Sequence, residues 1–71
     1  MAELPGAAVK RLVVKHGGEF RISGSALQAA VAAAEDYIGR LARAAAASAQ
    51  DGKRKTIMDA DIEKARQSTG G

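Results

Sequence analysis

One uninterrupted stretch, residues 24 to 50, constrains the fold of this 71-residue chain more than any other feature. The stretch contains no proline and a single interior glycine, Gly39. Its larger apolar residues recur at alternating steps of four and three, a period near 3.5 that is typical of an α-helix with one apolar stripe. At about 1.5 Å per residue such a helix would be about 40 Å long. The stripe consists of Leu27, Val31, Ala34, Ile38, Leu41, Ala45 and Ser48.

The apolar stripe of so long a helix must be buried, and the rest of so short a chain cannot bury all of it. The sequence has no cysteine and one histidine, so neither a disulfide framework nor a zinc site is expected, and no cofactor site is predicted. The numerous alanines of the stretch would let two long helices cross closely. We therefore expect a homodimer or a pairing with a related chain, through an interface formed by Leu27, Val31, Ala34, Ile38, Leu41 and Ala45.

Shorter helices are predicted on both sides of the long one, over residues 5–16 and 58–67, within a single domain, 1–71. Pro5 suits a first helical turn, and Gly17 with Gly18 ends that helix. The long helix, about 24–51, has Ser23 as its expected N-cap, and Gly52 is expected to adopt the left-handed conformation at its end. Thr56 is the expected cap of the last helix, and residues 68–71 are expected to fray.

Composition excludes several classes of protein. No signal peptide and no window of about 20 apolar residues is found, which predicts a soluble, intracellular protein without a membrane partner. Two aromatic residues, Phe20 and Tyr37, are too few for a reader that stacks bases of single strands, and both are expected in the core or at the dimer contact. Asp59, Asp61 and Glu63 alternate along a helix and point apart, so neither an enzyme nor a small-molecule substrate is expected.

The residues at the joints of this short–long–short pattern resemble the archaeal histone family. The matching segments are "ELP" at 3–5, Arg11 in the first helix, "RIS" at 21–23 with Ala26, "RKTI" at 54–57 and "DIEKA" at 61–65. The resemblance implies an all-α histone fold, an intertwined head-to-tail dimer, and a minimal histone without tails. It also implies a place on the chromosome, in the nucleoid or cytoplasm of a prokaryote.

The same resemblance implies roles for particular residues. Arg54 is expected to pair with Asp61 and to brace the second loop. In the head-to-tail dimer the first loop of one chain lies beside the second loop of the other, which brings the cations of both loops together. Contacts to phosphates and an arginine in the minor groove, the role Arg21 would inherit, bind duplex DNA without reading its sequence. The DNA-binding residues implied are Lys10, Arg11, Lys15, Arg21, Ser23, Lys53, Lys55 and Thr56.

The sequence departs from the family where dimers stack into longer assemblies through a histidine–aspartate pair and apolar neighbours. Here Asp51 occupies the histidine's place, opposite Asp61, and Ser48 and Lys64 replace apolar contacts. We expect two carboxylates to face each other there, so a dimer is the main predicted species and stacking into tetramers is weak. There is also about one more residue than usual between Gly17 and Arg21.

Two functions remain open at this point. The first is an architectural protein whose dimer bends, coats or wraps duplex DNA without sequence preference. The second is a histone-fold interaction subunit that pairs with a different chain and binds DNA only incidentally, which the modest net charge of +3 allows. Folding of the purified chain as a homodimer would distinguish the first from the second.

Overall fold

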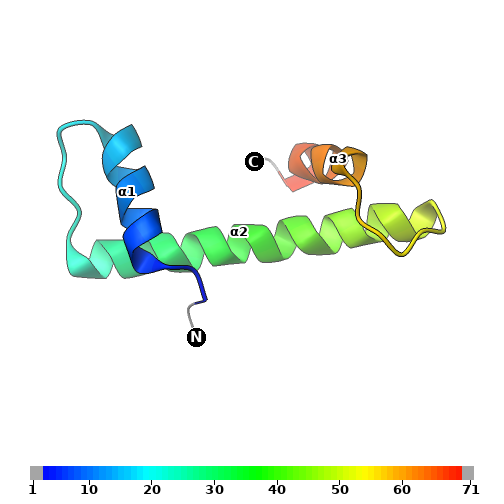
Figure 1. Ribbon diagram of the computed structural model, residues 1–71, viewed down its shortest axis with the longest axis horizontal. Helices are drawn as coiled ribbons and strands as arrows, with labels where there is room; N and C mark the ends of the chain where they lie inside the picture. Colours follow the sequence, from blue (N-terminus) through cyan, green and yellow to red (C-terminus); the bar gives the residue numbers. More distant parts are fainter. Residues whose placement is uncertain (1–2, 70–71) are drawn as a thin grey trace. The chain divides into compact units, whose positions relative to one another are not determined.

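The computed structural model describes residues 3–69, and these residues form three helices and no strand. The helices are α1 (Gly6–Gly17), α2 (Gly24–Asp51) and α3 (Asp59–Thr69), and Figure 1 shows the single long helix with a short one connected to each of its ends. The fold is therefore all-α, with the short–long–short order that the sequence predicts. The chain divides into two compact units, one ending at Glu35 and one beginning at Asp36, each of which contains one part of α2.

Helix α1 begins after Pro5 and ends at a glycine pair. Pro5, expected in the first turn, instead occupies the N-cap position one residue before the helix, with φ −63°, and its carbonyl accepts the N–H of Val9 at 3.2 Å. Gly18 follows the helix with φ 73°, a left-handed conformation that costs glycine little. The two glycines therefore end α1 and lead the chain into the loop 18–23.

The two ends of α2 are capped differently. Ser23 Oγ accepts the N–H of Ala26 at 3.1 Å, so Ser23 is the N-cap. At the other end, Lys53 N donates to Gln50 O and Arg54 N donates to Ala49 O, both at 2.9 Å, a Schellman motif. The left-handed residue of that motif is Lys53, with φ 58°, so the expectation that Gly52 would adopt this conformation was wrong.

Helix α3 begins and ends elsewhere than the sequence suggests. It starts at Asp59, so Met58 and not Thr56 precedes it, and Met58 N donates to Asp61 Oδ2 at 2.8 Å. The helix continues to Thr69, where the expected frayed tail was wrong for residues 68 and 69, because the hydroxyls of Ser68 and Thr69 donate to Ala65 O. Residues 70 and 71 lie outside the described part.

Each unit has a small core. In the second unit the buried apolar residues are Ala45 and Ala49 on α2 and Ala65 on α3, so the two helices meet through alanines that permit close approach. In the first unit Val31 is buried. The expectation of a dimer interface needs correction at Ala45, which is 0% exposed within one chain, and Val31 also has almost no surface left for a partner.

Several large apolar side chains of both units remain exposed, which is what a chain with so small a core leaves uncovered. They are Leu12, Val14, Phe20, Ile38, Ile57 and Met58. Leu27, Ala34 and Leu41 of the predicted interface are half-buried, and Ile38 is exposed. No helix within residues 3–69 is both long enough and apolar enough to cross a membrane.

Candidate nucleic-acid interface

The carboxylate of Asp61 is the centre of the second unit's polar structure. Arg54 donates to it twice, from Nη1 to Oδ2 at 2.8 Å and from Nη2 to Oδ1 at 2.9 Å. Ser48 Oγ donates to Oδ1 at 2.7 Å, and the N–H of Met58 donates to Oδ2 at 2.8 Å. Asp61 is only 1% exposed, whereas the Arg54 side chain is 40% exposed, so the carboxylate is covered and the guanidinium keeps some contact with water. The site joins the end of α2, the loop 52–58 and the start of α3.

These donors fix the charge state of the site. The Arg54 guanidinium, together with the Met58 N–H and the Ser48 hydroxyl, holds the pKa of Asp61 far below its usual range, against the effect of burial. In return, Asp61 raises the pKa of Arg54. Asp61 is therefore ionised at neutral pH, and the loop is attached to it by two parallel charge-assisted bonds that orient the guanidinium plane.

The loop 52–58 is shaped around Arg54. Besides its two bonds to Asp61, Arg54 Nη1 donates to the carbonyl of Thr56 at 3.1 Å, which closes the loop on itself. A Cβ on Gly52 would lie 3.1 Å from both Nε and Nη2 of Arg54, so the glycine leaves room for the guanidinium. Gly52 is thus needed for close approach and not for a positive φ. The guanidinium thus makes three hydrogen bonds within the described chain, two to Asp61 and one to Thr56 O.

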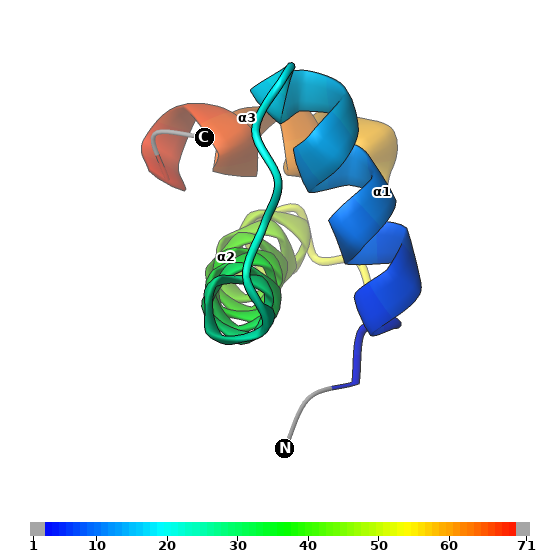
Figure 2. The ribbon, with the colours of Figure 1, turned by 90° about the vertical axis from the view of Figure 1, so that its left-hand side faces the viewer.

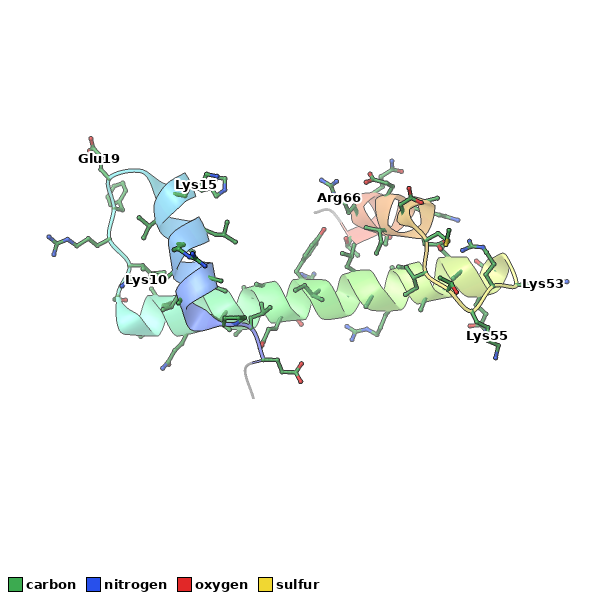
Figure 3. All side chains as sticks on the ribbon, viewed as in Figure 1. Lys10, Lys15, Glu19, Lys53, Lys55 and Arg66 are labelled. Carbon is green, nitrogen blue, oxygen red and sulfur yellow. The ribbon has the colours of Figure 1, made fainter. Side chains whose placement is uncertain are left out.

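Lys53 and Lys55 lie on either side of Arg54 and extend away from the loop (Figure 3). Within residues 3–69 neither forms an ion pair, and both are exposed. Lys53 holds its left-handed φ of 58° without the freedom of glycine. The side chain of Thr56 is exposed as well. The braced loop therefore presents two free ammonium groups on a backbone that Arg54 holds in place.

The loop 18–23 of the first unit has fewer internal bonds. Figure 2, which views α2 from its first residues, shows this loop joining the end of α1 to the start of α2. The Ser23 hydroxyl accepts the N–H of Ala26 as the N-cap of α2. The N–H groups of Gly24 and Ser25 at the helix start therefore stay open to another acceptor. Arg21 is exposed and has no hydrogen-bond partner or ion pair in the described chain.

The cations of α1 are all exposed: Lys10, Arg11 and Lys15. Lys10 lines a hollow of about 310 Å³ together with Arg21, so the structure brings one helix cation and the loop arginine to the same place. Other basic residues have local partners. Arg40 pairs with Asp36 at 3.6 Å, and Arg66 pairs with Glu63 at 3.8 Å.

Several features of the site were missed by sequence reasoning. Ser48 was expected at an interface between dimers, whereas its hydroxyl bonds Asp61 within one chain. The signal was present, because a hydroxyl on an otherwise apolar stripe needs a hydrogen-bond partner when it is covered. The buried Asp61 also has no exposed face to oppose Asp51 of another dimer, so the expected opposition of two carboxylates is wrong for Asp61. Phe20, expected in the core or at the dimer contact, is 80% exposed in the chain.

A further missed feature is a carboxylate that binds the backbone of Glu3 and Leu4, before α1. Glu35 on α2 accepts the backbone N–H of Leu4 at 2.8 Å and that of Glu3 on the same oxygen, Oε2. These two bonds, Leu4 first, lower the pKa of Glu35. The segment before α1 is thereby attached to α2 within the first unit.

The described residues contain no cluster of histidine or acidic side chains that could hold a metal ion. A family model, the core histone H2A/H2B/H3/H4 domain, matches residues 6–68. No solved structure gave a significant match to the chain. The matched segment includes all of α1 and α2, both loops, and α3 except for Thr69. The chain therefore belongs to the core histone family, whose members are structural DNA-binding proteins that pair through this fold and are not enzymes.

Proposed function

We propose that this protein is an architectural histone of the archaeal type, a homodimer that binds duplex DNA without sequence preference and bends, coats or wraps it. Its contacts go to the phosphate backbone and the minor groove. The residues that make them are Lys10, Arg11, Lys15, Arg21, Ser23, Lys53, Lys55 and Thr56.

The observation that carries the proposal is the separation of roles within "KRK", residues 53–55. The middle cation, Arg54, donates to Asp61 and to Thr56 O, while Lys53 and Lys55 have no partner in the described chain. A loop that only had to be soluble would not need a buried carboxylate beneath it. Cations held on a fixed backbone lose less entropy when they meet phosphates, which favours binding.

Formation of the dimer brings the DNA-binding residues of two chains together on one surface. In the head-to-tail arrangement of this fold, Arg21 of one chain joins Lys53 and Lys55 of the other, and the α1 cations of both chains form a third patch between the two loop pairs. Such a row of cations matches a duplex backbone, whose charge is evenly spaced. Within residues 3–69 we find no set of side chains suited to reading base edges in the major groove, so the binding should not depend on base identity.

The test is the affinity of the purified protein for two duplexes of equal length and unrelated sequence, matched in their number of TA steps and free of A-tracts, over a salt series. We expect equal affinities that fall steeply as salt rises. Arg21→Ala, or Lys53→Ala combined with Lys55→Ala, should reduce the slope of log affinity against log salt by about 1 for each phosphate that is no longer neutralised, summed over both chains. Arg66→Ala is the control of equal charge, because Arg66 pairs locally with Glu63. A folded dimer that binds neither duplex at low salt would contradict the proposal.

We further propose that the dimer is the main species in the absence of DNA. Asp61, which family members use between dimers, is saturated here by Arg54, Ser48 and Met58 N and is buried. It has no acceptor left to offer a second dimer. Light scattering at micromolar concentration should give the mass of two chains, and a mass near four chains would contradict this part of the proposal.

The competing function is a subunit that pairs with a different histone-fold chain. The exposed apolar residues Leu12, Ile38 and Met58 require a cover in either case, so they do not identify the partner. The purified chain distinguishes the two functions. A cooperative, concentration-dependent unfolding transition of the chain alone supports the homodimer, whereas aggregation that a second chain relieves supports the subunit.

A further inference from the structure

Phe20 is the most exposed large apolar side chain of the described residues. It is 80% exposed, compared with 56% for Leu12, the next highest. Leu12 lies on a helix, where a second chain can cover a whole apolar face, whereas Phe20 lies in the loop 18–23 between two charged neighbours, Glu19 and Arg21. An aromatic ring in such a place is not explained by the core of either unit.

The surroundings of Phe20 are cationic. Its ring lines the hollow of about 310 Å³ that also contains Lys10 and Arg21, with Val14 as its apolar wall. Neither cation has an acidic partner in the described chain, and Glu19, the single acidic residue of the lining, extends outward from the loop (Figure 3). A chain of net charge +3 would meet these cations with like charge, whereas a polyanion complements them.

We propose that Phe20 is an apolar wedge that enters the minor groove beside Arg21 and opens a base step there. This inference rests on the proposed binding of duplex DNA. Proteins that bend DNA from the minor groove combine a cation that enters the groove with an apolar side chain that partly unstacks one step. Adjacent residues in one loop, Arg21 and Phe20, offer both groups at each end of a dimer.

A wedge gives the protein a preference that phosphate contacts alone cannot give. Pyrimidine–purine steps such as TA unstack easily, while A-tracts are stiff. The wedge therefore favours duplexes with TA steps at the loop positions, through deformability and not through base identity. Truncation of the ring leaves every phosphate-binding cation in place, so the dependence of affinity on salt should stay the same.

The experiment compares the wild-type dimer with Phe20→Ala and Phe20→Leu on two duplexes of equal length, one with central TA steps and one with A-tracts. End-to-end energy transfer measures bending, and a salt series measures affinity. For Phe20→Ala we expect loss of the preference for TA steps, about tenfold weaker binding to that duplex, a smaller bend and an unchanged salt slope. Phe20→Leu should restore part of the bend, because leucine can still act as a wedge.

Unfolding at several protein concentrations, followed by circular dichroism, is measured on the same variants. If Phe20→Ala lowers the stability of the dimer and the decrease in DNA affinity follows the decrease in dimer, Phe20 belongs to the contact between chains and the inference is overturned. Unchanged bending and affinity in a folded Phe20→Ala dimer overturn it as well, while leaving the proposed DNA binding intact. Failure of the wild-type dimer to bind either duplex would instead remove the proposed function itself.

Discussion

The two loops of the chain present their cations on very different supports: the loop 18–23 has Arg21 beside Glu19, whereas the loop 52–58 has Lys53, Arg54 and Lys55 and no acidic residue. In the loop 52–58, Arg54 joins a buried carboxylate, a backbone carbonyl and the space above Gly52 into one rigid arrangement. In the loop 18–23, the only side-chain hydrogen bonds within the described residues are those of Ser23, to Ala26 N and to Ser25 Oγ. The second loop is ordered by its own chain. The first has side-chain hydrogen bonds at one end only, and its Phe20 is 80% exposed.

Removal of the buried charge of Asp61 should have the largest effect, and it should affect the loop 52–58 and not the loop 18–23. Asp61→Asn replaces an acceptor of four hydrogen bonds with an amide whose NH₂ faces donors, and leaves Arg54 without its counter-ion. We expect the Tm at fixed protein concentration to fall by on the order of 10 °C. DNA affinity should fall even where the protein remains folded, because Lys53 and Lys55 lose their fixed backbone. Asp36→Asn, on an exposed pair with Arg40, is the control and should change little.

Acid should weaken the second unit by the same route. The folded-state pKa of Asp61 is depressed, so its contribution is fully present above the pKa of an unfolded aspartate, about 3.9, and is lost as the pH falls below it. Stability should therefore decline from about pH 5 to about pH 2, because only the unfolded chain takes up the proton over this range. Glu35, with its lowered pKa, adds a contribution of the same sign. Urea unfolding at each pH checks the decline, which should be shallower in Asp61→Asn.

Replacement of the left-handed Lys53 by glycine should raise the stability of the fold and lower the affinity for DNA. Lys53 adopts φ 58° at a cost of about 1 kcal/mol that glycine would not incur, so Lys53→Gly should be more stable by about this amount. The same variant should bind DNA more weakly, with a smaller salt slope. Both quantities come from urea unfolding and a salt series on one preparation.

Gly52→Ala is the matched control for that substitution. Its backbone needs no positive φ, but the new Cβ would crowd Arg54 at 3.1 Å, and the guanidinium cannot move without loosening its bonds to Asp61. We expect lower stability at this adjacent position. Stabilisation by Gly52→Ala would show that the brace is looser than the hydrogen bonds imply.

The smallest effect is expected in the first loop. Ser23→Ala removes the N-cap of α2, which costs about 1 kcal/mol in comparable helices. Because the loop has few other internal bonds, Arg21 should lose no further order, and DNA affinity should change less than in Asp61→Asn. Hydrogen exchange of residues 18–27 and of 52–61 measures the order of both loops. Equal protection of the two loops in the wild-type protein would contradict the comparison.

The sequence by itself determined the helices and their order. The phase of the apolar stripe, the glycine pair at 17 and 18 and the serine at 23 are local signals, since each acts on backbone within one or two turns. It also predicted a pairing of Arg54 with Asp61 through resemblance to a family, and the structure places Arg54 Nη1 2.8 Å from Asp61 Oδ2.

Only the tertiary structure decided which groups other than Arg54 bind the Asp61 carboxylate. Ser48 and Asp61 are 13 positions apart and meet because α3 folds back on the end of α2, a contact that no local pattern encodes. The structure also places the left-handed conformation at Lys53, while Gly52 leaves room for the Arg54 guanidinium. It also buried Ala45 within the chain and left Phe20 exposed, because burial depends on which surfaces meet in space and not on hydrophobicity alone.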